Sequence, residues 1–199
     1  MPDVILFDLF GVIARHQSRA GRDTLVRIAG LPEADFWPSY WHERVAYDAG
    51  LVTGTEYWRR VGGFTEERIA ALIEADIASW SEVDEEMVDL LERAAAAGVR
   101  LALLSNIPAE LAAHYERHHR RWLRHFELVA FSCRIGLAKP DPAAYRWCCR
   151  ALGLAPDRLL FVDDRDENVA AARRVGLDTH LFVGLGLDLV QRVGDLGAR

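Results

Sequence analysis

The chain has 199 residues, of which 51% are hydrophobic and 27% charged, as is typical of a globular protein with one sizeable core, or a core and a smaller satellite. Its net charge of −6 gives no support for nucleic-acid binding, and no apolar run approaches the roughly 20 residues of a membrane span. We therefore expect neither nucleic acid nor a membrane as a partner. The N-terminus does not resemble a signal peptide, and Cys133, Cys148 and Cys149 are an odd set that suits disulfides poorly. A cytoplasmic location is expected.

The first predicted element is the uninterrupted apolar run Val4–Phe7, which ends at Asp8. A short apolar run without alternation predicts a strand buried on both faces, as in parallel sheets. Asp8 would then lie where the strand leaves the sheet, at the edge where α/β proteins bind ligands. A carboxylate in this position can be a nucleophile, a metal ligand or a cap that ends the strand.

Residues 14–80 contain no strand-like run and show helical periodicity interrupted by Gly and Pro. The pattern predicts helices over residues 21–29, 33–49, 53–61 and 66–79. Thr65 before Glu66 and Glu67 is typical of a helix N-cap with an acidic first turn. Aromatic residues are concentrated here: Trp37, Tyr40, Trp41, Tyr47, Tyr57 and Trp58.

From residue 83 onward, strand-like and helical patterns alternate. The predicted strands cover residues 99–104, 128–131, 159–162 and 180–183. The predicted helices cover residues 84–97, 108–121, 142–152 and 167–175. Strands joined by helices predict an α/β fold with a doubly wound parallel sheet.

Polar groups follow two of these later strands directly. Ser105 and Asn106 come after the second strand and could donate hydrogen bonds to an oxyanion, or simply cap the next helix. Asp163 and Asp164 come after the fourth strand, and because adjacent carboxylates repel each other, a hard divalent cation is their natural partner. Mg²⁺ could be held by Asp8, the backbone carbonyl of Phe10 and one of this pair.

Lys139 is the only lysine in the chain, since every other basic residue apart from histidine is arginine. It stands in the sequence Lys-Pro-Asp-Pro, between the third strand and the next helix. A compact ammonium group differs chemically from a guanidinium fork and is common in phosphate sites. We interpret Lys139 as a functional residue.

The ordered set of Asp8, Ser105, Lys139 and Asp163-Asp164 resembles the four motifs of the haloacid dehalogenase (HAD) superfamily, and the resemblance covers essentially the whole chain. It implies a Rossmann-like core formed by residues 1–14 and 81–199, with residues 15–80 as an inserted helical cap domain. It is strongest to the branch with a small helical-bundle cap, which includes sugar-phosphate phosphatases and the phosphatase domain of epoxide hydrolases.

The resemblance also implies roles. Asp8 would be the nucleophile, with Ser105, Asn106 and Lys139 completing the catalytic set. Asp164 would bind Mg²⁺ directly, and Asp163 would hold a water or Lys139. Asp166 and Asn168 are expected to cap the following helix. The implied function is that of a Mg²⁺-dependent phosphatase, a monomer or homodimer, acting on a small phosphorylated metabolite through an aspartyl-phosphate.

Phe10 departs from the phosphatase pattern, in which a second Asp at this position protonates the leaving oxygen. General acid–base catalysis is typically worth ~10²–10⁴ in rate. The leaving group would then need no proton, or another group such as His42 or Glu43 would supply one, or the catalyst would be weak. Haloacid dehalogenases carry an aromatic residue here, so a 2-haloacid dehalogenase is one alternative and a silent scaffold that binds a metabolite or partner is another.

Substrate contacts are expected from the cap. Trp41, His42 and Arg44 are predicted to approach the active site together with Phe10, although aromatic residues at helical spacing also commonly fill a core.

Overall fold

The computed structural model describes residues 2–197, apart from the side chain of Asp195. Its centre is a five-stranded sheet in the order β3-β2-β1-β4-β5, and every neighbouring pair of strands is parallel. The strands are β1 (Val4–Phe7), β2 (Arg100–Ser105), β3 (Phe126–Phe131), β4 (Leu159–Asp163) and β5 (Asp178–Leu181). The predicted α/β fold with a parallel sheet is confirmed.

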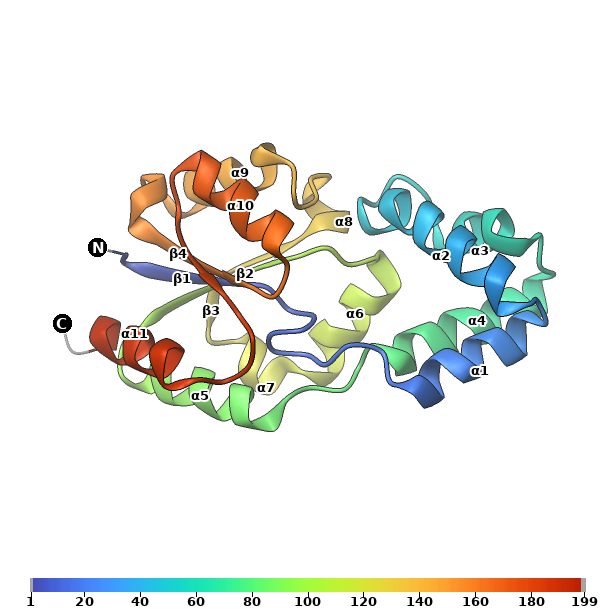
Figure 1. Cartoon of the computed structure of the whole chain (residues 1–199), viewed down its shortest axis with the longest axis horizontal. Coiled ribbons are helices and arrows are strands. Elements are labelled where there is room, and N and C mark those ends of the chain that lie inside the picture. Colours follow the sequence, from blue (N-terminus) through green and yellow to red (C-terminus); the bar gives the residue numbers. More distant parts are fainter. Residues whose placement is uncertain (1, 198–199) are drawn as a thin grey trace.

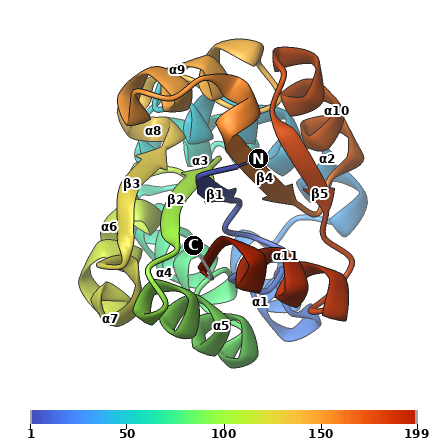
Figure 2. The same ribbon diagram turned by 90° about the vertical axis from the view of Figure 1, so that its left-hand side faces the viewer.

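Helices cover both faces of the sheet (Figure 2). One face is covered by α8 (Ser132–Ile135), α9 (Pro142–Leu152) and α10 (Asp166–Val175). The other is covered by α5 (Glu85–Ala96), α6 (Ala109–His118), α7 (Arg120–Leu123) and α11 (Leu187–Gly197). A short 3₁₀ turn, Pro156–Arg158, precedes β4.

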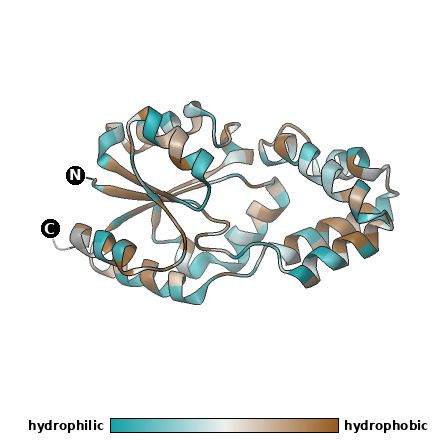
Figure 3. Ribbon diagram, in the orientation of Figure 1, coloured by the Kyte–Doolittle hydropathy of each residue, from teal (hydrophilic) through white to brown (hydrophobic). Residues whose placement is uncertain are grey.

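The buried side chains of β1 alternate between two hydrophobic cores. Ile5 and Phe7 belong to the core beneath α5 and α6, whereas Val4 and Leu6 belong to the core beneath α9 and α10. This explains why the sequence of β1 shows no polar alternation, since both faces are covered. Figure 3 shows the same arrangement, with hydrophobic strands at the centre and mixed helices outside them.

Four helices between β1 and α5 form a separate helical segment at one end of the molecule (Figure 1). They are α1 (Arg19–Ala29), α2 (Glu33–Asp48), α3 (Gly54–Gly62) and α4 (Glu66–Ser79). Their buried residues form a third hydrophobic cluster, which includes Phe36, Tyr40, Tyr57 and Trp58.

The chain enters and leaves the helical segment side by side. Ala14 pairs with Val83 in an isolated antiparallel bridge. The Arg15 amide donates to the Glu82 carbonyl at 2.8 Å, and the Asp84 amide donates to the Ile13 carbonyl at 2.9 Å.

Several predicted boundaries were wrong. The helix expected over 108–121 ends at His118, and the chain restarts as α7. The fifth strand lies at 178–181 rather than 180–183. The short helix α8 and the C-terminal helix α11 were not predicted. No helix among the described residues is long and apolar enough to cross a membrane.

Candidate active site

Asp8 directly follows β1, and its backbone amide donates to the Val162 carbonyl of β4 at 2.8 Å. Its carboxylate is buried, with Oδ1 accepting a hydrogen bond from the Leu9 amide at 2.7 Å and lying 2.6 Å from Lys139 Nζ. The end of the central strand therefore holds this carboxylate in a fixed orientation.

Lys139 joins two carboxylates. Its buried ammonium lies 2.6 Å from Asp8 Oδ1 and 2.8 Å from Asp163 Oδ2. The Asn106 side chain holds the Lys139 backbone from both sides: its Nδ2 donates to the Lys139 carbonyl at 2.8 Å, and its Oδ1 accepts from the Lys139 amide at 2.8 Å. Asn106 thus anchors Lys139 in place.

The pKa values of Asp8 and Lys139 differ from their usual values. Loss of hydration raises the pKa of Asp8 to about 7, with Lys139 opposing the shift and Asp163 adding to it. Burial alone would lower the pKa of Lys139, but Asp8 and Asp163 outweigh it and raise that pKa above its usual value. Two carboxylates share one ammonium, so the group carries one excess negative charge when Asp8 is ionised.

Asp163 is fully buried, and its carboxylate accepts hydrogen bonds on both oxygens. Lys139 Nζ and Asn168 Nδ2 bind Oδ2, while Asn168 Nδ2 and the Arg165 amide bind Oδ1. Asp166 and Asn168 were predicted to cap the following helix, and both predictions were wrong, since Asp166 is the first residue of α10. Asn168 is buried. It lies inside α10, its side chain is directed at Asp163, and the N-cap residue is Arg165.

Asp164 is less buried and differently paired. Its Oδ2 lies 2.9 Å from His16 Nε2, whereas its Oδ1 is buried and has no hydrogen-bond partner among the described residues. Oxygen atoms of Asp8, Asp163 and Asp164 all lie within 4.8 Å of one another. Clustered carboxylate oxygens with one unpaired atom fit a hard cation such as Mg²⁺, which takes oxygen ligands.

Gly11 makes room for Asp164. A Cβ atom at Gly11 would lie 2.3 Å from Asp164 Oδ2 and 2.7 Å from His16 Nε2, and the backbone φ of +83° also favours glycine. The turn after β1 can therefore approach the carboxylate cluster only with glycine at this position.

Ser105 ends β2 and is fully buried, and its hydroxyl has no hydrogen-bond partner among the residues that the structure describes. An unpartnered buried hydroxyl is unusual, since most such groups are satisfied. Its hydroxyl is therefore a donor that no described residue uses.

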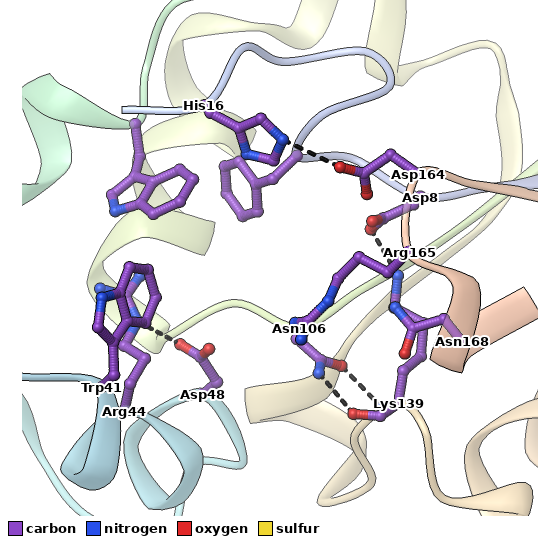
Figure 4. Close-up of a pocket in the computed structure, with 12 residues that line it drawn as sticks. Asp8, His16, Trp41, Arg44, Asp48, Asn106, Lys139, Asp164, Arg165 and Asn168 are labelled. Atoms are coloured by element: carbon purple, nitrogen blue, oxygen red, sulfur yellow. Dashed lines mark hydrogen bonds and ion pairs between the residues drawn. The ribbon is translucent and has the colours of Figure 1, made fainter. Parts of the chain in front are cut away.

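Asp8, Lys139 and Asp164, but neither Ser105 nor Asp163, border a cavity of about 430 Å³ between the sheet and the helical segment (Figure 4). Its size is within the range of small-molecule sites. The end near the sheet is lined by Asp8, Asn106, Lys139, Asp164, Arg165 and Asn168. The end near the helical segment is lined by Phe10, His16, Trp41, Arg44, Asp48 and Trp80.

Phe10 lies in the cavity wall and packs edge-on against Trp80, with ring centroids 5.0 Å apart, and against Tyr115 at 5.9 Å. It is held by aromatic packing rather than by polar contacts. The side chain at this position is therefore part of an apolar wall.

Two of the three residues predicted to reach the site from residues 15–80, Trp41 and Arg44, line the cavity. His42 does not: its side chain is 85% exposed and lies 4.0 Å from the Glu43 carboxylate. Successive residues of a helix project about 100° apart, so neighbours of Trp41 point elsewhere.

Sequence reasoning missed His16, Asp48, Trp80, Arg165 and Asn168 as lining residues. Asp48 had one available signal, because it lies four residues after Arg44 on a predicted helix and is 2.8 Å from it. His16 and Trp80 lie at the two ends of the inserted segment, and only the folded chain brings them to the cavity.

Comparison with known proteins identifies the family. The sequence profile of haloacid dehalogenase-like hydrolases matches residues 2–176. The chain belongs to this family of hydrolases. Phosphoglycolate phosphatase 1 of Pseudomonas aeruginosa is 28% identical over 186 residues, covering 89% of this chain and 68% of the relative. A phosphatase of Mycobacterium tuberculosis is 26% identical over 205 residues, covering 98% of this chain and 94% of the relative.

Solved structures of HAD enzymes share the fold. A HAD family enzyme of Bacteroides thetaiotaomicron superimposes with a TM-score of 0.81 at 20% identity, covering 96% of this chain and 98% of that one. The same enzyme has also been solved with magnesium and inorganic phosphate. The L-2-haloacid dehalogenase of Xanthobacter autotrophicus superimposes with a TM-score of 0.68 at 19% identity, covering 96% and 82%. Both enzymes therefore share the fold of this HAD hydrolase.

Proposed function

We propose that this HAD hydrolase is a Mg²⁺-dependent phosphatase for a small phosphorylated metabolite, with Asp8 as the nucleophile. The observation that carries the proposal is the buried Asp8 carboxylate, in contact with Lys139 and beside the Asp163–Asp164 pair. The phosphatase relatives support the same reaction class.

In this mechanism Asp8 attacks phosphorus through Oδ2, because Oδ1 is held by Lys139 and the Leu9 amide. The bond from phosphorus to the leaving oxygen breaks with its electron pair passing to that oxygen, which takes a proton from water, and Asp8 carries the phosphoryl group as a covalent intermediate. Water then attacks that intermediate, which releases inorganic phosphate and restores the carboxylate.

Lys139 and the Ser105 hydroxyl would hold the phosphoryl oxygens. The Ser105 hydroxyl has no partner among the described residues but does not line the cavity, whereas Asn106 lines the cavity and already donates to the Lys139 carbonyl. Asp8, Asp164 and the Phe10 carbonyl would hold Mg²⁺, with Asp163 orienting Lys139. When bound, the ion would neutralise charge on the phosphoryl oxygens.

We further propose that residues 15–80 act as a cap domain over a core formed by residues 1–14 and 81–199. The separate hydrophobic cluster of the helical segment and its single paired connection to the sheet support this division. The position of Trp41 and Arg44 in the cavity wall supports a role of the cap in substrate contact.

The dehalogenase alternative is favoured by one observation, the aromatic side chain of Phe10 in the cavity. Against it stands the cluster of Asp8, Asp163 and Asp164, which without a cation would repel an anionic haloacid. The phosphatase is therefore the better-supported function.

A panel of phosphate esters and 2-haloacids, assayed after metal removal and again with Mg²⁺, tests the proposal. Phosphate release that requires Mg²⁺ and is lost in Asp8→Asn is expected, while halide release without metal would identify a dehalogenase. Calorimetric titration with Mg²⁺ should show binding by the wild type and by Asp166→Asn, a nearby exposed control, but not by Asp164→Ala. Equal, weak Mg²⁺ binding by wild type and Asp164→Ala would overturn the metal assignment.

A further inference from the structure

The cavity end formed by the helical segment contains both charge and aromatic surface. Helix α2 contributes Trp41, Arg44 and Asp48 to it (Figure 4). Trp80 also lines this end and packs against Trp41. If a phosphoryl group binds at Asp8, as the proposed function holds, the remainder of the substrate faces this end. The residues at this end of the cavity therefore determine which leaving groups can bind.

Arg44 commits two of its three side-chain nitrogens to protein groups, and no hydrogen bond among the described residues uses Nη2. Its side chain is 6% exposed; Nε donates to Asp48 Oδ1 at 2.8 Å, and Nη1 donates to Asp76 Oδ2 at 2.9 Å. One guanidinium between two carboxylates leaves one negative charge in excess. Arg44 therefore positions Asp48, in addition to lining the cavity.

Asp48 is the charged group that this wall presents to the cavity. Its side chain is 17% exposed, and Oδ1 is occupied by Arg44. No hydrogen bond among the described residues uses Oδ2. The backbone is fixed as well, because the Asp48 carbonyl accepts a hydrogen bond from the buried Ser132 hydroxyl. An ionised carboxylate only accepts hydrogen bonds, so Oδ2 recognises a donor.

The rest of this wall is apolar. Trp41 is 49% exposed and lies edge-on to Trp80, with ring centroids 6.3 Å apart, and Trp80 in turn contacts Phe10. Such surfaces suit methylene groups and also attract cations over the ring faces.

We propose that Asp48 is a specificity-determining residue that accepts a hydrogen bond from a hydroxyl or ammonium group on a short aliphatic leaving group, and that it excludes leaving groups bearing a carboxylate. This assignment rests on the phosphatase function proposed above. It separates the chain from a phosphatase for carboxylate-bearing esters such as phosphoglycolate.

The test uses alkyl phosphates of two to four carbons whose far end is a methyl, hydroxyl, ammonium or carboxylate group. For the wild type, kcat/KM should be at least tenfold higher with the hydroxyl or ammonium end than with the methyl end, and lowest with the carboxylate end. In Asp48→Asn the ammonium esters should lose at least tenfold and the carboxylate esters should gain at least tenfold. Comparison of the hydroxyl and ammonium series identifies which donor is preferred.

Asp76→Asn is the matched control, because Asp76 is also buried and paired with Arg44 but does not line the cavity. It should leave the ranking of the four end groups unchanged. A wild-type preference for carboxylate ends would overturn the inference even if Asp48→Asn does not fold. If Asp48→Asn and Asp76→Asn change the ranking of the four end groups equally, the inference is also overturned.

Hydrolysis of p-nitrophenyl phosphate separates the two proposals. Turnover of this ester without any end-group preference would overturn only the role of Asp48. No turnover of any phosphate ester would overturn the phosphatase function and the role of Asp48 with it.

Discussion

At the scale of single residues, the dominant feature is the excess of negative charge around Lys139. Asp8 and Asp163 share its ammonium, and Asp164 Oδ1 is buried nearby with no hydrogen-bond partner in the part of the chain that the structure describes. Burial raises the pKa of Asp8 to about 7 in this metal-free arrangement. A cation binds carboxylates in the ionised form, so metal binding and the loss of a proton from Asp8 are coupled.

We predict that Mg²⁺ affinity increases with pH. The folded-state pKa of Asp8 lies above its usual value of 3.8, so in the metal-free protein the proton is retained up to about pH 7. Below that pH the affinity should fall by up to about tenfold per pH unit, and above it the affinity should level off. Calorimetry across this range in two buffers of different ionisation enthalpy would count the released proton. An affinity that stays constant across this range would contradict the prediction.

The raised pKa of Asp8 also makes the stability of the metal-free protein depend on pH. A carboxyl whose pKa is raised by folding binds more protons in the folded state, so its contribution to stability falls as pH rises from about 4 to about 7. In chelator, Asp8→Asn should therefore gain stability relative to wild type over this interval.

The variant Phe10→Asp tests whether turnover is limited by the lack of a general acid at position 10. If proton transfer limits turnover, the variant should raise activity on alkyl phosphates, whose leaving oxygens need a proton, much more than on aryl or acyl phosphates. Phe10 packs against Trp80 and Tyr115, so a carboxylate there will also cost stability. The ratio of the two rates is therefore the quantity to measure. An unchanged ratio in a folded, Mg²⁺-binding variant would show that another group already supplies the proton.

The residues that sequence analysis predicted and those that it missed differ in how they reach the cavity. Asp8, Ser105 and Asp163 end or directly follow apolar strands, and parallel strands end at a common edge, so a pattern predicts their proximity. Asn168 reaches Asp163 through the packing of a helix, and His16 reaches Asp164 through an irregular turn. Neither approach leaves a periodic signal in the sequence.

At the scale of elements, α2 contributes residues to two environments. Trp41, Arg44 and Asp48 follow helical spacing and line the cavity, whereas Tyr40 and Tyr47 are buried in the cluster of the helical segment. The sequence predicted the helix within one residue at its end. It could not predict which aromatic residues face the cavity, because both environments contain them and the packing of α2 on its neighbours decides.

Arg44 links α2 to α4, and its removal should be costly. Arg44→Met would leave Asp48 and Asp76 buried without their cation, which we expect to lower the free energy of unfolding by about 3–5 kcal/mol. Urea denaturation measures the change. Arg60→Met is the matched control: this α3 side chain is 50% exposed and pairs loosely with Glu43, so we expect a loss below about 1 kcal/mol. Similar losses in both variants would show that the buried ion pairs contribute little.

At the scale of the whole molecule, Glu110 of α6 holds the helical segment against the sheet. It accepts a hydrogen bond from the Tyr47 hydroxyl at 2.8 Å and another from the Gly54 amide at 3.1 Å. The Ser132 hydroxyl makes a further contact, with the Asp48 carbonyl. These contacts join the helical segment to α6 and α8 at points other than the paired connection.

We predict that Glu110→Ala loosens this arrangement. Loss of both hydrogen bonds should speed hydrogen exchange of the Gly54 amide by about tenfold, as expected for a bond worth about 1–1.5 kcal/mol, and should increase the radius of gyration measured by X-ray scattering. Glu116→Ala is the control, since Glu116 lies on the same helix but pairs with the exposed Arg134. Unchanged Gly54 exchange in Glu110→Ala would show that other contacts hold the segment.

The pairing of Ala14 with Val83 affects how the sequence of the helical segment can change in evolution. Because the chain leaves the sheet and returns at one point, the intervening residues can be lengthened, shortened or exchanged without altering the register of any strand. The entropic cost of closing a longer loop grows only slowly with its length. In evolution, a single replacement of the gene segment that encodes these residues could therefore give the enzyme a new substrate. Asp8, Lys139 and Asp164 would remain unchanged.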